Sequence, residues 1–214
     1  MCNSQTSRVK VLIEILDKAQ KLNFLGNAPI TDHVKNANGF LEAIRTFSKD
    51  NQYGNIIDIG SGGGVPALIL IEKLENWSFV LLERKQKRAE FLTQAIRALD
   101  VSERVEVVCD EVENVARSMD YMYTADFVTA RAFGPPAVTA ECACRLLKRN
   151  KFLVVSEPPN SENRWVDGNL ASTGLSAVKY LKLGISSFQV LQLTNQPSDK
   201  LPRRPGIPRK RPLW

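Results

Sequence analysis

The 214-residue sequence predicts an α/β protein. We expect a seven-stranded, mostly parallel sheet with its last strand antiparallel, helices on both faces, and a helical extension before it. Three observations predict this fold. From residue 55 onward, short apolar runs rich in β-branched residues alternate with helical stretches. The runs are apolar at successive positions, which is typical of strands buried on both faces. The last two runs are joined by a link too short for a parallel crossover.

A helical extension is expected over residues 1–52. Residues 8–22 place apolar side chains at helical spacing, which predicts an amphipathic helix. After a loop, a second helix is expected from about 32 to 47. Gly39 predicts a weak point within that helix, because glycine is a poor helix former.

The main domain is expected over residues 53–196. Its predicted strands lie at 56–59, 79–82, 105–108, 127–130, 152–155, about 177–183 and about 188–194. Helices are expected between the first five strands, at about 65–74, 86–99, 111–118 and 136–148. The last two strands are separated only by residues 184–187, so they should pair antiparallel.

A C-terminal tail is expected over residues 197–214, and its part from 200 onward holds all of the net charge of +6. The chain has 29 basic and 23 acidic residues, and no acid follows residue 199. Prolines spaced along the tail discourage helix and strand, so we expect an extended strip with its charges available to phosphate groups. The alternative is a disordered tail that only aids solubility. The basic residues of the tail are Lys200, Arg203, Arg204, Arg209, Lys210 and Arg211.

Several classes of protein are excluded by what the sequence lacks. No apolar run approaches the roughly 18 residues of a membrane span, and no secretory signal is apparent. Four cysteines are too few for a disulfide framework. Cys142 and Cys144 have no accompanying histidines or second cysteine pair, so we interpret them as small helix residues and expect no metal. The sequence therefore predicts a cytoplasmic protein. We also expect a monomer.

The most informative segment is a glycine loop that follows the first predicted strand, Asp58-Ile59-Gly60-Ser61-Gly62-Gly63-Gly64-Val65-Pro66. Glycines there let the backbone turn tightly and approach a ligand without a Cβ in the way. The next strand ends at Glu83, whose carboxylate suits the two hydroxyls of a ribose. A loop that merely turns the chain is the structural alternative.

Two cofactors use such a layout, and details of the loop favour one of them. A dinucleotide site requires G-x-G-x-x-G/A, and starting from Gly60 the third position is Val65, which fails. Starting from Gly62, the frame reaches Ala67 but places Pro66 in the loop. Asp58 fits better beside the cationic methionine part of S-adenosylmethionine than beside a pyrophosphate. We therefore favour S-adenosylmethionine and keep dinucleotide binding as the alternative.

Two further places complete the candidate site. In this architecture the loop after the third strand lies against the adenine, which makes Val112 and Glu113 candidate contacts. The alternative is an acidic helix start that favours the helix dipole. Arg131 closes the fourth strand at the carboxyl edge, where the active sites of open sheets lie. Taken alone, Arg131 would be interpreted first as a surface salt-bridge residue, and only the other segments favour the active-site role.

Five segments together carry a resemblance to one family. They are the lead with Leu25-Gly26 and His33-Val34-Lys35-Asn36, the glycine loop from Ile57 to Pro66, the stretch from Glu83 to Leu92, the strand from Asp126 to Phe133, and the tail from Pro202 to Leu213. On these segments the chain resembles the small-subunit (16S) ribosomal RNA guanine-N7 methyltransferase family, also known as glucose-inhibited division protein B.

The resemblance implies a class I, Rossmann-like methyltransferase fold, S-adenosylmethionine as methyl donor, and N7 of a guanine in 16S rRNA as acceptor. The partner would be 16S rRNA, the small ribosomal subunit or its precursor. Family cofactor contacts map onto Gly60, Val65, Val112, Glu113 and Arg131, and Arg131 would lie beside the reaction centre. Alternatives are a class I methyltransferase with another substrate, and a non-catalytic cofactor-binding factor in ribosome assembly.

The sequence departs from the family pattern at four places. The usual arginine of the adenine loop is Glu111, the usual Pro-Gly after the glycine loop is Pro66-Ala67, and the segments around the fifth strand read Asn150-Lys151 and Glu157-Pro158. Two basic groups near the cleft are thereby lost.

The expected chemistry needs few side chains. Guanine N7 has a free lone pair, so no general base is required, and the enzyme chiefly aligns the reactants. The motifs of exocyclic-amine and cytosine C5 methylation are missing. His33 is the only histidine, and we interpret it as structural or RNA-contacting.

Overall fold

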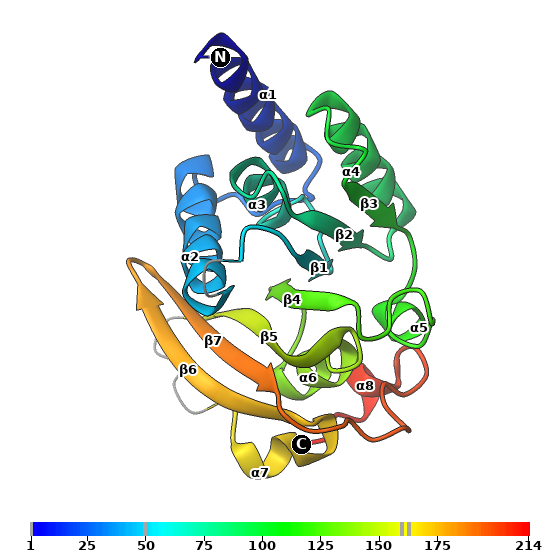
Figure 1. Cartoon of the computed structure of the whole chain (residues 1–214). Coiled ribbons are helices and arrows are strands. Elements are labelled where there is room, and N and C mark those ends of the chain that lie inside the picture. Colours follow the sequence, from blue (N-terminus) through cyan, green and yellow to red (C-terminus); the bar gives the residue numbers. More distant parts are fainter. Residues whose placement is uncertain (1, 49–50, 159–160, 162–163) are drawn as a thin grey trace.

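A computed structural model gives the arrangement of residues 2–48, 51–158, 161 and 164–214 (Figure 1). Seven strands form one sheet in the order β3-β2-β1-β4-β5-β7-β6. Their bounds are β1 Asn55–Ile59, β2 Ser78–Leu82, β3 Val105–Val108, β4 Ala125–Arg131, β5 Leu147–Glu157, β6 Leu175–Leu183 and β7 Ser186–Leu193. The first five strands pair parallel, and β7 pairs antiparallel with both β5 and β6, as the sequence predicts.

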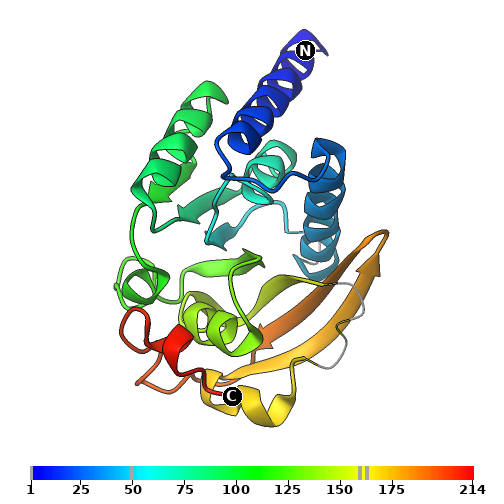
Figure 2. The same ribbon diagram turned by 180° about the vertical axis from the view of Figure 1, so that it is seen from behind.

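Helices cover both faces of the sheet, as Figures 1 and 2 show from opposite sides. One hydrophobic core lies between one face of the sheet and the first four helices. It contains Ile56, Phe79 and other side chains of that face. The second core lies on the opposite face and takes their neighbours Ile57 and Val80. This alternation follows from the period of two in a strand. The helices are α1 Cys2–Lys21, α2 Ile30–Ser48, α3 Ala67–Lys73, α4 Gln86–Ala98, α5 Val112–Val115, α6 Pro136–Ala143, α7 Asp167–Leu170 and α8 Ile207–Lys210, with a 3-10 turn at Ala171–Thr173.

The helical extension differs from the sequence prediction in two ways. Helix α1 begins at Cys2, six residues before the expected start at residue 8. Helix α2 runs unbroken through Gly39, so the predicted weak point is wrong. A Cβ at Gly39 would collide with the ring of Phe188 on β7. This glycine therefore serves close packing of the helix against the sheet.

The boundary between α6 and β5 is also corrected. A helix was expected from 136 to 148, but α6 ends at Ala143 and β5 begins at Leu147. Leu147 pairs with Ala125, and the Nζ atoms of Lys148 and Lys151 lie 2.8 and 2.9 Å from the carboxylate of Asp126. These contacts with β4 favour strand over helix. Cys144 follows the last residue of α6 and is buried, and burial raises the pKa of its thiol to about 12.

The basic tail folds back onto the body, so the expected extended strip is wrong. Nε and Nη2 of Arg203 donate to the carboxylate of Glu141 at 2.8 and 2.6 Å, and the backbone N of Arg203 donates to the same group. The side chain of Glu141 is fully buried, and a buried carboxylate requires such a partner. Pro208 lies in the first turn of α8, where proline is tolerated. Figure 1 shows α8 beside α6.

Candidate cofactor site at the carboxyl edge of the sheet

The glycine loop connects β1 to α3 at the carboxyl edge of the sheet. Gly60, Gly62 and Gly64 have φ of +71°, +54° and +90°, which side chains with a Cβ rarely adopt. The backbone N of Gly60 donates to the carbonyl of Leu82 on the neighbouring strand at 2.9 Å. A Cβ at Gly63 would lie 2.8 Å from the carbonyl oxygen of Phe24. The helical extension therefore packs directly against this loop.

Glu83 follows β2 and holds the loop in place. Its Oε2 accepts a hydrogen bond from the backbone N of Gly62 at 3.0 Å, and its Oε1 accepts one from the backbone N of Lys85 at 2.8 Å. The residue is buried but borders the cavity described below. Each carboxylate oxygen has a second lone pair, so the geometry still allows a ligand diol to donate to it.

Asp58 lies in β1, next to the start of the glycine loop, and is 1% exposed. Thr129 Oγ1 on β4 donates to Asp58 Oδ1 at 2.6 Å. Burial raises the pKa of Asp58 to about 6, although the hydrogen bond from Thr129 and the charge of Arg131 oppose the rise. An ionised Asp58 in this place favours a neighbouring positive charge.

Arg131, the last residue of β4, is half-buried and linked to the helical extension. Its Nη2 lies 2.7 Å from His33 Nδ1, and His33 Nε2 lies 2.9 Å from the carbonyl oxygen of Gly26. Burial lowers the pKa of Arg131, while the charge of Asp58 acts to raise it. His33 is 3% exposed, which favours the structural of its two predicted roles.

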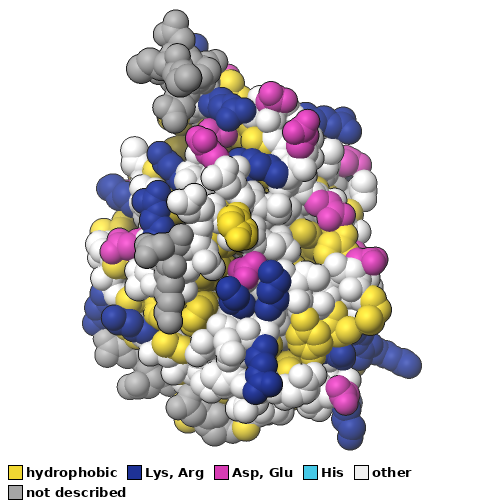
Figure 3. Space-filling view, in the orientation of Figure 1, with side chains coloured by type: hydrophobic (Ala, Val, Ile, Leu, Met, Phe, Trp, Pro, Cys, Tyr) yellow, Lys and Arg dark blue, Asp and Glu magenta, His cyan; other side chains and the backbone are white. Residues whose placement is uncertain are grey.

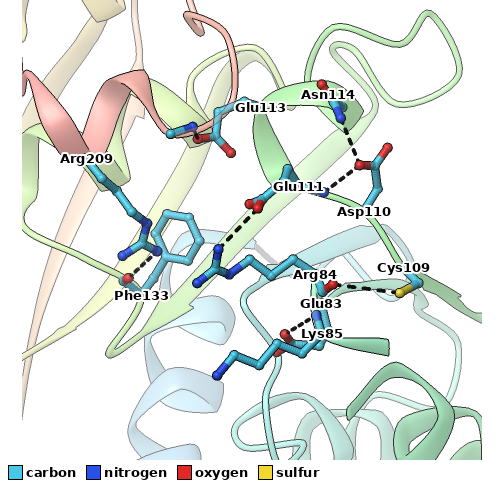
Figure 4. A network of polar contacts seen from close by, with 11 residues as sticks. Glu83, Arg84, Lys85, Cys109, Asp110, Glu111, Glu113, Asn114, Phe133 and Arg209 are labelled. Carbon is cyan, nitrogen blue, oxygen red and sulfur yellow. Dashed lines mark hydrogen bonds and ion pairs between the residues drawn. The ribbon is translucent and has the colours of Figure 1, made fainter. Parts of the chain in front are cut away.

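A cavity of about 230 Å³ opens at this edge of the sheet. Figure 4 shows several of its lining residues, among them Glu83, Phe133 and Arg209. The cavity unites four of the predicted cofactor residues, Gly60, Glu83, Val112 and Glu113. Asp58, Gly62, Gly64, Val65 and Arg131 lie outside its lining, and Val65 is buried in the core. The full lining is Gly60, Leu82, Glu83, Arg84, Lys85, Arg88, Glu111, Val112, Glu113, Ala132, Phe133 and Arg209.

Larger hollows lie elsewhere, and one of about 540 Å³ beside α1 is lined mostly by apolar side chains. The cavity at the glycine loop is smaller, but it lies where the strands end and where acids and positive-φ glycines meet. Ligands of open α/β sheets bind at this edge. The smaller cavity is therefore the candidate functional site.

Phe133 and Arg209 form a wall of the cavity that sequence reasoning missed. A Cβ at Gly60 would lie 2.8 Å from the Phe133 ring. Ala132, with φ of +51°, adopts the left-handed conformation just before Phe133. The guanidinium of Arg209 lies 5.2 Å from the centre of that ring, and its Nη2 donates to the Phe133 carbonyl at 3.0 Å. Figure 4 shows Arg209 reaching over the ring from α8.

The tail also holds the adenine-loop candidate Glu113. The backbone N of Gly206 donates to Glu113 Oε1 at 3.1 Å. Glu113 is buried, so its carboxylate contributes to docking the tail. The sequence does not predict this contact, because its donor is a backbone N–H and the tail's basic side chains are interpreted as RNA-binding groups.

The two acids that replace basic family residues are each paired with an arginine. Glu111 Oε1 lies 3.2 Å from Nη1 of Arg84 (Figure 4). Glu157 Oε2 lies 2.6 Å from Nη1 of Arg164, and Glu157 Oε1 accepts a hydrogen bond from Trp165 Nε1 at 2.9 Å. The negative charges are therefore compensated locally. Figure 3, in the orientation of Figure 1, shows Lys and Arg side chains beside an acidic side chain near the middle of the visible face.

Ala67 and Asn150, the remaining departures, do not line the cavity. Ala67 is buried at the start of α3, and Asn150 is an exposed residue of β5. Neither change alters the cavity wall.

The described part of the chain holds no group of three or more His, Cys, Asp and Glu side chains arranged to bind a metal. No helix in the same part is both long and apolar enough to cross a membrane.

A family model and the curated relatives described below all carry the same description. The family described as "GidB: rRNA small subunit methyltransferase G" matches residues 9–169. Two curated relatives carry the name Ribosomal RNA small subunit methyltransferase G. The one from Dictyoglomus thermophilum is 32% identical over 164 residues, which cover 74% of this chain and 68% of the relative. The one from Thermotoga neapolitana is 30% identical over 211 residues, which cover 95% and 89%.

Solved structures share the fold at lower identity. An S-adenosylmethionine-dependent methyltransferase from Aquifex aeolicus superposes with a TM-score of 0.58 at 15% identity, covering 83% of this chain and 97% of that protein. The expected seven-stranded class I methyltransferase fold is thereby confirmed.

Proposed function

This chain belongs to the rRNA small subunit methyltransferase G family, and we propose that it transfers a methyl group from S-adenosylmethionine to N7 of a guanine in 16S rRNA. The observation that carries the proposal is the edge where Asp58, the glycine loop and Glu83 meet beside the cavity. Both acids and the open glycine backbone suit a cationic nucleoside.

Different residues at this edge would contact different parts of the methyl donor. Asp58 and the backbone from Gly60 to Val65 would lie at the cationic methionine end, with the glycines giving the close approach. Glu83 would accept hydrogen bonds from the ribose, and Val112 and Glu113 would border the adenine. When bound, S-adenosylmethionine supplies a methyl group on a sulfonium, which is already activated for transfer.

The acceptor needs alignment more than activation. Guanine N7 forms the new bond with its own lone pair, so no side chain has to remove a proton. His33 has both ring nitrogens engaged, which agrees with a reaction that requires no histidine base. Arg131 is the proposed catalytic residue, because its guanidinium can donate to guanine O6 beside N7. Orienting the reactants in this way lowers the activation barrier by roughly several kcal/mol.

RNA docking is assigned to the exposed basic residues of the tail. Arg203 is excluded from that set because Glu141 binds its guanidinium. The proposed phosphate contacts are Lys200, Arg204, Arg209, Lys210 and Arg211. The target guanine has to lie in a loop or opened structure, because the major groove of A-form RNA is too narrow for side chains. We further propose a monomer that acts in the cytoplasm without a metal.

The test is methylation of 16S rRNA by the purified protein. We expect 7-methylguanosine in nuclease digests analysed by mass spectrometry when 16S rRNA or small subunits are incubated with protein and S-adenosylmethionine. R131A should still bind the donor in calorimetry, although more weakly because Arg131 is also an expected cofactor contact, and it should lose most of the product.

If the protein binds the donor but methylates another base or another molecule, guanine N7 of 16S rRNA is not its acceptor. Failure to bind the donor would overturn the whole proposal. The pairing of Glu111 and Glu157 with arginines favours an enzyme over a non-catalytic assembly factor, because the acids that replace basic family residues are compensated locally.

A further inference from the structure

His33 uses both nitrogens of its ring to connect a loop of the helical extension to the end of β4. Nε2 lies 2.9 Å from the carbonyl oxygen of Gly26, and Nδ1 lies 2.7 Å from Nη2 of Arg131. The ring is almost completely buried. Water therefore cannot readily replace either partner.

The two partners determine which nitrogen carries the proton. A carbonyl oxygen only accepts hydrogen bonds, so Nε2 must donate to Gly26. A guanidinium only donates, so Nδ1 must accept from Arg131 with its lone pair. His33 is consequently neutral with its proton on Nε2. A protonated ring would direct a second N–H at the guanidinium and break the link.

We propose that His33 is a positioning residue, which fixes the guanidinium of Arg131 beside the methyl-transfer site by accepting its hydrogen bond. The inference rests on the proposed function of Arg131. That guanidinium is half-buried and needs partners for its donors, and Asp58 contributes attraction through its charge. Without His33 the arginine would lose its hydrogen-bond partner on α2, and its orientation would relax.

Docking of helix α2 has other supports, which separates this role from a merely structural one. Asn36, one turn after His33, donates from Nδ2 to Ser156 Oγ at 3.1 Å and to Ser186 Oγ at 3.0 Å. Gly39, a further turn along, packs against the Phe188 ring. Asn36 and Gly39 therefore fasten the helix to β5 and β7, whereas His33 bonds the arginine.

The first experiment observes the ring directly. His33 is the only histidine, so a two-dimensional spectrum that correlates its ring nitrogens and protons contains one unambiguous set of signals. We expect the Nε2–H tautomer at neutral pH, with Nδ1 unprotonated. An Nδ1–H tautomer would overturn the proposal whether or not the protein proves to be a methyltransferase.

The second experiment is a double-mutant cycle on methylation. H33F should lower kcat on the order of 100-fold with little change in the affinity for S-adenosylmethionine, because a misplaced group costs about this much. H33Q should recover most of that loss, since its amide can donate to Gly26 and accept from Arg131. In an R131A background, H33F should have almost no further effect.

N36A is the matched control, because it removes hydrogen bonds of α2 without touching Arg131. It should lower thermal stability but leave kcat within a few-fold of wild type. Effects of H33F and R131A that multiply, or an equal loss of kcat in N36A, would overturn the positioning role. If wild-type protein makes no 7-methylguanosine, the proposed function fails instead, and the tautomer remains as measured.

Discussion

At the carboxyl end of β1, the side chain of Asp58 lies out of water with a hydrogen bond from Thr129. Burial is the largest influence on this carboxyl and raises its pKa to about 6. A cation beside Asp58 stabilises the ionised form, so cation binding and proton release are linked. The protonated form below pH 6 attracts the cation less.

This linkage predicts how donor binding depends on pH. The affinity of wild-type protein for S-adenosylmethionine should rise about tenfold from pH 5 to pH 7 and level off above, following the ionised fraction of Asp58. Isothermal titration calorimetry across this range measures it. D58N should bind weakly with little pH dependence. A wild-type affinity that is constant from pH 5 to pH 7 would show that Asp58 does not contact the cation.

At the scale of elements, the fit of α2 against the sheet depends on a residue that lacks a side chain. The ring of Phe188 on β7 occupies the place that a Cβ of Gly39 would need, and the same ring packs edge-on against Phe40 at 4.9 Å between centroids. Propensity alone would favour alanine over glycine by about 1 kcal/mol in a helix. Packing outweighs that gain here.

G39A is therefore expected to lower the free energy of unfolding by about 1–3 kcal/mol, the usual range for overpacking a core. Urea denaturation followed by circular dichroism measures the change. G26A is the matched control, because nothing lies within 4 Å of a Cβ added there. If G39A proves as stable as G26A, the close approach does not constrain the helix.

The accuracy of the sequence prediction also varied by element. Strands β1 to β4 were predicted within a few residues, because apolar β-branched runs between polar turns allow few alternatives. The start of β5 was missed because the run from Leu146 to Lys148 fits a helix as well as a strand. Pairing with Ala125 and the ion pairs at Asp126 decide between them, and neither is visible in a local pattern.

At the scale of the molecule, the tail is part of the fold as well as a proposed RNA contact. Arg203 neutralises the buried Glu141, whereas Arg204, Lys210 and Arg211 are exposed. Removing one partner of a buried ion pair typically costs about 3–5 kcal/mol. Exposed charges contribute little to stability but add to salt-dependent binding of RNA.

Two variants of the tail should therefore behave oppositely. R203S should lower the midpoint of urea denaturation strongly. The triple variant R204S/K210S/R211S should unfold like wild type, yet the slope of log Kd for 16S rRNA against log salt should fall by about 2. Filter binding at several salt concentrations measures the slope. An unchanged slope would remove the exposed tail residues from the RNA interface.

The glycine loop, Asp58 and Glu83 could be predicted because strand ends and glycine clusters are recognisable from a short stretch of sequence. The wall made by Arg209 and Phe133, the contact of Gly206 with Glu113, and the pair Arg203–Glu141 could not. Their partners lie 76, 93 and 62 residues apart in the chain. Proline spacing predicted an extended tail, but a buried acid on α6 and another at α5 outweighed that local preference.

The two hydrogen bonds that Glu83 accepts from the backbone affect how much side-chain entropy is lost when a ligand binds. The carboxylate is already held in one orientation by Gly62 and Lys85 before any ribose arrives. The side chain of Glu83 therefore loses its conformational entropy when the chain folds, and it loses little more when a ligand binds. In the proposed role of Glu83, each new nucleoside would meet an acceptor that needs no rearrangement, and its hydrogen bonds would add to affinity without the cost of ordering the side chain.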